Sequence, residues 1–298
     1  MSDISGRPVV VGVDGSESSL RAVRWAADRC GRRGTGLRLV HACQVPTGYR
    51  PGIVDEGTLR TAMESQSRGW LAEARQAAEQ AVPGLHIDTV LEVAPSVPAL
   101  VKESGDASLL VLGSRGLGGF TGLLVGSTSV ELAGRARCPV VVVRGPGDEA
   151  PPTEGPVVVG VDGTELSEAA IGFAFAEASV RQAELVALHA WTDLVLETAF
   201  PSGAAALDFT PLAQEAEETL AERLAGRQEE YPDVHVTRKV VRERPTRALL
   251  RFAENAQLVV VGSRGRGGFR GLLLGSTSQH LLQHARCPVA VVRTDNEA

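Results

Sequence analysis

The sequence predicts an α/β protein of two tandem domains, each a parallel β-sheet with helices on both faces. Two observations carry this prediction. First, the stretch from Gly113 to Val143 is repeated from Gly262 onward, with 22 of the 31 aligned positions identical. Second, short apolar runs alternate with helix-compatible segments in each half. That alternation is typical of a parallel sheet covered by its crossover helices.

Each half begins with the same apolar run, PVVVGV, followed by Asp-Gly and a hydroxyl residue. An apolar run without polar alternation is typical of a central parallel strand that is covered on both faces. The hydroxyl residues are Ser16 and Thr164. Both are predicted to be N-caps of the next helix, because a hydroxyl oxygen there can accept a hydrogen bond from a first-turn amide.

The remaining elements follow in the same order in both halves. Second, third, fourth and last strands are expected at 36–45, 86–93, 109–112 and 140–144, and again at 183–191, 234–242, 258–261 and 289–293. Further helices are expected at 58–81 and 97–103, at 212–228 and 247–255, and before each last strand. Each half therefore has five strands that alternate with helices.

A segment between the halves has the composition of a linker. Residues 144–156 read RGPGDEAPPTEGP and combine proline, glycine and acidic residues. We therefore expect a first domain over 1–145, a linker over 146–156 and a second domain over 157–298. The 298 residues, 43% of them hydrophobic, suffice for two domains with a core each.

Composition excludes several classes of protein. The net charge of −6, without a basic tail, argues against a nucleic-acid binder. The four cysteines form no Cys-x-x-Cys pair, and Cys138 and Cys287 are repeat equivalents, so reduced and packed thiols are expected. The N-terminal sequence has no signal-peptide pattern, and no apolar run is long enough to span a membrane. We expect a soluble, cytoplasmic protein that binds neither membranes nor nucleic acid.

The glycine-rich stretch after each fourth strand is the strongest functional signal. In the first half, glycines at 113, 116, 118, 119, 122 and 126 precede Ser127 and Thr128. Glycine lets the backbone approach a ligand closely, and successive N–H groups that lead into a helix form a concave anion site. The spacing G-x2-G-x9-G-S/T differs from the P-loop and from the Rossmann fingerprint. One such copy could be a flexible surface loop, but two copies with the same hydroxyls favour a phosphate site.

The Asp-Gly turn after the first strand of each half is expected to lie beside this loop. Ligands of doubly wound sheets bind outside the carboxyl ends of the strands, where the strand order reverses. Asp14 could accept a hydrogen bond from a ribose or help to hold a cation near phosphates, or it could be only a turn residue, since Asp-Gly is a common turn pair. Val40 could flank a purine. Arg115 and Arg264 could contact phosphates or remain exposed.

The second loop is the more basic of the two, since it adds Arg266 and Arg270. This difference predicts tighter binding of a triphosphate in the second half.

No catalytic set is evident in the sequence. The chain has no G-x-S-x-G elbow, no suitably placed pair of carboxylates and no lysine placed like that of a P-loop or a kinase. His280 and His284 have the i, i+4 spacing of metal ligands, but no third ligand is evident, so no metal site is predicted. Binding is therefore favoured over turnover, with weak ATP hydrolysis as the upper limit.

These residues resemble a known family. The G-x2-G-x9-G-S/T motif in both halves, the V-G-V-D-G start and the late C-P-V-x-V-V strand are similar to the ATP-binding class of universal stress proteins in its tandem-domain form. The resemblance covers nearly the whole chain. It implies Rossmann-like domains with strand order 3-2-1-4-5, and one ATP, with Mg²⁺ as a candidate companion, at the carboxyl edge of each sheet. It also implies a stress-response role in which ATP binding is a regulatory signal.

By motif position, the resemblance implies a set of nucleotide-binding residues in each half. Those of the first half are Gly12, Asp14, Val40, Gly113, Ser114, Arg115, Gly116, Leu117, Gly118, Gly119, Gly126, Ser127 and Thr128. Those of the second half are Gly160, Asp162, Asp193, Gly262, Ser263, Arg264, Gly265, Arg266, Gly267, Gly268, Gly275, Ser276 and Thr277.

The resemblance also implies antiparallel pairing of the last strands, between the two domains or across a homodimer formed through edge strands, and a protein partner of unknown identity. Two alternatives remain open. One is an adenine-nucleotide hydrolase of related fold, although VDGSES lacks the paired glycines of its S-G-G-x-D-S loop. The other is a scaffold whose nucleotide sites are vestigial.

Overall fold

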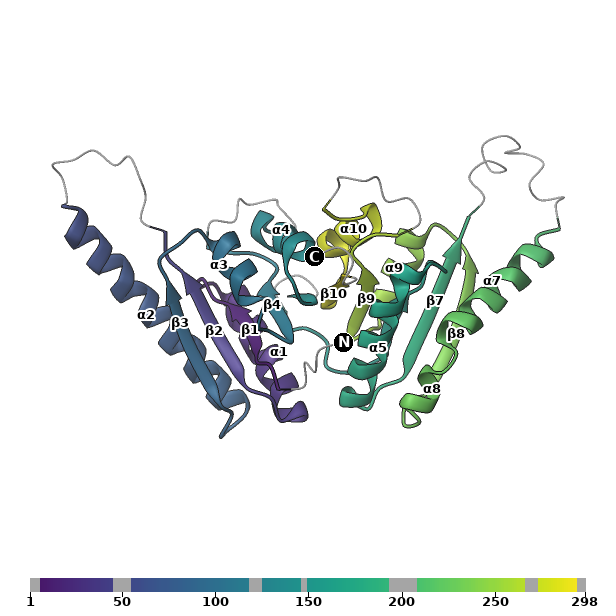
Figure 1. Cartoon of the computed structure of the whole chain (residues 1–298), viewed down its shortest axis with the longest axis horizontal. Coiled ribbons are helices and arrows are strands. Elements are labelled where there is room, and N and C mark those ends of the chain that lie inside the picture. The colour runs from purple at the N-terminus through teal and green to yellow at the C-terminus, as the bar shows by residue number, and fades with distance from the viewer. Residues whose placement is uncertain are drawn as a thin grey trace. The chain divides into compact units, whose positions relative to one another are not determined.

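The computed structural model describes residues 6–44, 55–117, 125–145, 149–192, 208–265 and 273–293. The chain divides into two compact units. Unit 1 is Met1–Pro151 with Pro288–Val291, and unit 2 is Pro152–Cys287 with Val292–Thr294. Each unit is an α/β structure built on a parallel sheet, as predicted (Figure 1).

The parallel sheet of unit 1 has the strand order β3-β2-β1-β4-β5. The strands are β1 (Val9–Gly12), β2 (Leu37–Ala42), β3 (Ile87–Glu92), β4 (Leu109–Gly113) and β5 (Val140–Val143). All three valines of β1 are fully buried, since this strand is central and covered on both faces. The order reverses between β1 and β4, where a ligand site is expected.

Four helices cover this sheet: α1 (Glu17–Arg33), α2 (Glu56–Ala81), α3 (Ser96–Glu103) and α4 (Ser127–Arg135). Helix α1 packs against α2, and α3 packs against α4. The predicted N-cap is confirmed, because the Ser16 side chain accepts a hydrogen bond from the Ser19 amide at 3.1 Å. Helix α1 ends at Gly34 in the left-handed conformation, with φ of 66°.

The parallel strands of unit 2 have the order β9-β6-β7-β8. They are β6 (Val157–Gly160), β7 (Leu185–Trp191), β8 (Val236–Arg242) and β9 (Leu258–Gly262). The helices are α5 (Glu168–Arg181), α7 (Thr210–Leu224), α8 (Arg227–Glu230), α9 (Pro245–Ala253) and α10 (Ser276–His284). The same order of elements thus appears in both repeats.

Two local predictions for unit 2 are wrong. Thr164 is not a side-chain cap: a 3₁₀ turn, Glu165–Ser167, follows it, and its hydroxyl donates to the Asp162 carboxylate at 2.7 Å. The helix expected over 212–228 is two helices, because Gly226 between them has φ of 77° and interrupts the helical conformation.

The last strand of the second repeat, β10 (Val289–Val292), pairs antiparallel with β5. In this pairing Val289 lies opposite Val142, and Val291 lies opposite Val140. The expected antiparallel pairing of the two last strands is therefore found within this chain. Because β4 and β10 flank β5, neither edge of β5 is open to a further strand.

No helix in the described part of the chain combines the length and the apolar character that crossing a membrane requires.

The four cysteines are buried, and none of them forms a disulfide. Burial raises the pKa of the Cys138 thiol to about 12, because the thiolate loses its hydration. At pH 8 this thiol is therefore almost entirely protonated, and the protonated form is unreactive. We expect Ellman's reagent to react slowly with the folded protein. After denaturation we expect it to react with all four thiols. Rapid labelling of Cys138 in the folded protein, located by peptide mass spectrometry, would contradict this account.

Candidate functional site

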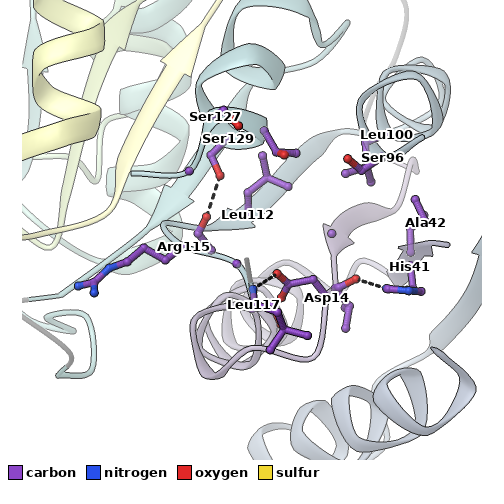
Figure 2. Close-up of a pocket in the computed structure, with 18 of the residues that line it drawn as sticks. Asp14, His41, Ala42, Ser96, Leu100, Leu112, Arg115, Leu117, Ser127 and Ser129 are labelled. Carbon is purple, nitrogen blue, oxygen red and sulfur yellow. Dashed lines mark hydrogen bonds between the residues drawn. The ribbon is translucent and has the colours of Figure 1, made fainter. Parts of the chain in front are cut away.

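A cavity of about 620 Å³ opens in unit 1 beside the carboxyl ends of β1, β2 and β4 (Figure 2). Its size lies within the range of small-molecule sites. The structure brings most of the first predicted site together around it. The lining includes Gly12, Asp14, Val40, Gly113, Arg115, Gly116, Leu117, Gly126, Ser127 and Thr128.

One side of the cavity is the start of α4. Gly126 is the N-cap residue and supplies no side chain, so the first-turn amides, beginning at Ser127, have no acceptor inside the helix. Two bonds hold this helix end beside β4: the Gly126 amide donates to the Ser114 carbonyl at 2.8 Å, and the Ser129 hydroxyl donates to the Gly113 carbonyl at 2.9 Å. The arrangement suits an anion.

Asp14 joins the first turn to the glycine loop. Its Oδ1 accepts hydrogen bonds from the amide and hydroxyl of Ser16, at 3.0 and 2.6 Å. Its Oδ2 accepts one from the Leu117 amide at 3.0 Å, as Figure 2 shows. Asp14 therefore stabilises the turn through these hydrogen bonds, and the same carboxylate also lines the cavity. Gly116 lies so close that an added Cβ would overlap the carboxylate.

The other side of the cavity is mainly apolar, with Val40, Ala42, Leu100 and Leu112 among its residues. The buried His41 also lines it. The His41 Nδ1 donates to the Val13 carbonyl at 2.6 Å, because a carbonyl oxygen can only accept. This bond fixes the ring, as expected for a packed histidine beside the site.

Sequence reasoning missed several lining residues, chiefly Trp70 on α2 and Ser96 on α3. Trp70 lies one helical turn before the buried Ala74, so its position on the sheet side of α2 could have been read from periodicity. Its place at the cavity could not have been read from periodicity, because this depends on how α2 packs against the turn that follows β1.

Some predicted residues lie elsewhere. Ser114 is buried and does not line the cavity, although its carbonyl holds Gly126. Arg115 is among the lining residues, but its side chain is exposed and extends away from Asp14 (Figure 2). Outside the described residues are Gly118, Gly119, Asp193, Arg266, Gly267, Gly268 and Arg270.

Unit 2 repeats this framework around its own loop. The Gly275 amide donates to the Ser263 carbonyl at 2.7 Å, and the Ser278 hydroxyl donates to the Gly262 carbonyl at 2.6 Å. Helix α10 again starts without a side-chain cap. The Asp162 Oδ1 also accepts a hydrogen bond from the hydroxyl of Ser167, at 2.6 Å.

Few side chains capable of acid–base chemistry line the described part of the unit 1 cavity. Among the described residues that line it, Asp14 is the one carboxylate and His41 the one imidazole, and there is no lysine or cysteine. The Nδ1 of His41 already forms a hydrogen bond with the Val13 carbonyl. No group of three histidine, cysteine or acidic side chains suitable for a metal occurs in the part of the chain described.

Comparisons with known proteins agree with this architecture. A family model described as "Universal stress protein family" matches residues 6–144 and 155–293. Universal stress protein Rv2005c of Mycobacterium tuberculosis is 44% identical over 290 residues, covering 96% of each chain. Universal stress protein Rv2623 of the same organism is 44% identical over 293 residues, again covering 96% of each. The crystal structure of a universal stress protein from Archaeoglobus fulgidus shares the fold, with a TM-score of 0.68, 20% identity, and 96% and 98% of the two chains covered.

Proposed function

Because the chain belongs to the universal stress protein family and carries that family's domain twice, we propose that it is an ATP-binding regulatory protein of the stress response. Each domain, over 1–145 and 157–298, provides one nucleotide site. Binding of ATP is the signal, and hydrolysis is slow or absent. The residues named above from the motif form the two sites.

One observation carries this proposal: the unit 1 cavity has an anion-binding end and an apolar end. The uncapped start of α4 and the glycine loop suit phosphates, whereas Val40, Ala42 and Leu100 suit a base. The volume of about 620 Å³ is adequate for a nucleotide.

A companion Mg²⁺ fits one feature of the cavity. Mg²⁺ is usually held by one or two carboxylates together with substrate phosphates. Asp14 is the one carboxylate among the described lining residues, and it would supply that ligand. Its bond to the Leu117 amide would then lengthen or break, which couples nucleotide binding to the position of the glycine loop.

The framework shared by both units supports one site per domain. In each unit the loop closes through a glycine amide, at Gly126 or Gly275, and through a helix serine that binds the last carbonyl of the strand. A vestigial site would not need to keep these bonds. A hydrolase would need charged groups placed together around the phosphates. The charged side chains of the described lining are Asp14 and Arg115, and the Arg115 side chain is exposed and extends away from Asp14.

The first test is the nucleotide content of the freshly purified protein. We expect denaturation to release about two ATP per chain, or the apo protein to bind two on addition of ATP and magnesium. Ion-exchange chromatography of the released nucleotide against protein concentration measures this ratio. Absence of bound nucleotide, before and after addition, would leave the vestigial scaffold as the better account. Release of ADP alone would favour the hydrolase.

Three further parts of the proposal concern the cellular setting: a cytoplasmic location, an unidentified protein partner and a homodimer through edge strands. Because β5 already has neighbours on both sides, a dimer through sheet edges would use another strand.

A further inference from the structure

Trp70 holds a fixed position at the edge of the unit 1 cavity. It is half-buried on α2 and lines the cavity. Its five-membered ring lies over Gly15, where a Cβ would come within 2.5 Å of the indole Cε2 and Nε1. The indole also meets His41 edge to face, with ring centroids 5.2 Å apart and planes at 68°. Contacts with the first turn and with β2 therefore fix the position of the ring.

The rest of that end of the cavity is mainly apolar, with Val40, Ala42 and Leu100 on the neighbouring elements and Ser96 beside Leu100. An indole in such surroundings offers a large, rigid, planar surface. Nucleobases stack on such surfaces whatever their pattern of hydrogen-bonding groups. The indole can therefore bind the base of a nucleotide, while the glycine loop binds its phosphates.

The described residues of unit 2 do not repeat this arrangement. Its corresponding helix, α7, reads TPLAQEAEETLAERL and contains no aromatic residue. Gly163 is the repeat equivalent of Gly15, and the two have similar φ values of 81° and 84°. What approaches Gly163 is a guanidinium: Arg223 Nε donates to the Gly163 carbonyl at 3.0 Å, and its Nη1 is paired with Glu168 at 3.2 Å.

Two aromatic residues of unit 2 pack on one another: Trp191 at the end of β7 and Phe209 at the start of α7. The rings of Trp191 and Phe209 have centroids 6.3 Å apart. The guanidinium of Arg242 lies over the Phe209 ring, 3.4 Å from its centroid. That face of Phe209 is therefore covered.

We propose that Trp70 recognises the nucleobase in the unit 1 site by stacking, and that helix α7, the counterpart of α2 in unit 2, makes no such contribution. This inference rests on the proposed function. It makes the two sites unequal: nucleotide affinity in unit 1 depends on a base, and affinity in unit 2 depends mainly on the phosphate-binding loop.

The test compares ATP with inorganic tripolyphosphate, which has the phosphates without the base. Isothermal titration of the full-length chain is done with the wild type, Trp70→Leu and Trp70→Phe. Leucine keeps apolar bulk without the ring, and phenylalanine keeps a ring. We expect Trp70→Leu to weaken one of the two ATP sites by about tenfold, the order expected for loss of one stacked base, and Trp70→Phe to recover most of that loss. Tripolyphosphate binding should be unchanged in both variants.

Arg223→Ala is the matched control in unit 2, and it should leave the base-dependent part of ATP binding unchanged. Equal ATP affinity of the wild type and Trp70→Leu would overturn the role of Trp70 and leave the proposed function intact. Equal loss of ATP and tripolyphosphate binding in Trp70→Leu would show a structural role and would also overturn it. A wild-type chain that binds neither ligand would overturn the proposed function itself, and this inference with it.

Discussion

Gly15→Ala is expected to lower the free energy of unfolding of unit 1 by about 3 kcal/mol. Two effects add at this position. Gly15 has φ of 84°, a conformation that costs a residue with a Cβ about 1 kcal/mol. The new methyl would also lie 2.5 to 2.6 Å from atoms of the Trp70 ring, and overpacking of this kind costs roughly 1–3 kcal/mol.

Urea unfolding followed by tryptophan fluorescence measures this loss, since Trp25 and Trp70 both lie in unit 1. Gly34→Ala is the matched control. Gly34 has φ of 66°, but no atom lies within 4 Å of an added Cβ, so only the backbone term of about 1 kcal/mol applies. Equal destabilisation by the two substitutions would show that Trp70 does not pack on Gly15. In a Trp70→Leu background, the free energy of unfolding lost through Gly15→Ala should come closer to that lost through Gly34→Ala.

Gly116→Ala is expected to weaken nucleotide binding in unit 1 by on the order of 100-fold, the effect of losing about 3 kcal/mol. The physical reason is the Asp14 carboxylate, which an added Cβ would overlap. Relief of this overlap moves Asp14 away from the Leu117 amide and separates the first turn from the glycine loop. Both groups are part of the proposed site, so the phosphate-binding geometry is lost.

Gly265→Ala in unit 2 should have a smaller effect, because its Cβ would lie 3.0 Å from Asp162 Oδ2, a distance that a small shift can relieve. Titration with ATP resolves the two sites by stoichiometry and affinity. Gly69→Ala, on α2 with no atom within 4 Å of the new Cβ, is the control that should bind like the wild type. Two unchanged ATP sites in Gly116→Ala would remove the phosphate-loop assignment, whatever its effect on stability.

Local sequence signals were enough to predict most of the fold. The uninterrupted run PVVVGV predicts a central strand, and Val9, Val10 and Val11 are fully buried in β1. The start of α1 at Ser16 followed from capping chemistry. The same reasoning failed at Thr164, because a 3₁₀ turn, Glu165–Ser167, follows it in place of the first turn of an α-helix. Donation to the preceding aspartate does not explain the difference, since the Ser16 hydroxyl donates to Asp14 in the same way and still accepts from the Ser19 amide.

The candidate site was likewise predicted in part from the sequence and decided in part by the tertiary structure. The sequence by itself determined the duplication, because the two copies can be aligned directly. It also determined the α/β class and the glycine loop with its two hydroxyls, because these depend on residues that are neighbours in the chain. Only the tertiary structure decided that Trp70 lies over Gly15, that Asp14 holds the Leu117 amide and that β5 pairs with β10. Each of these contacts joins residues far apart in sequence. Their formation depends on the rotation of a helix, the course of a loop or the register of two strands, and no local pattern encodes these.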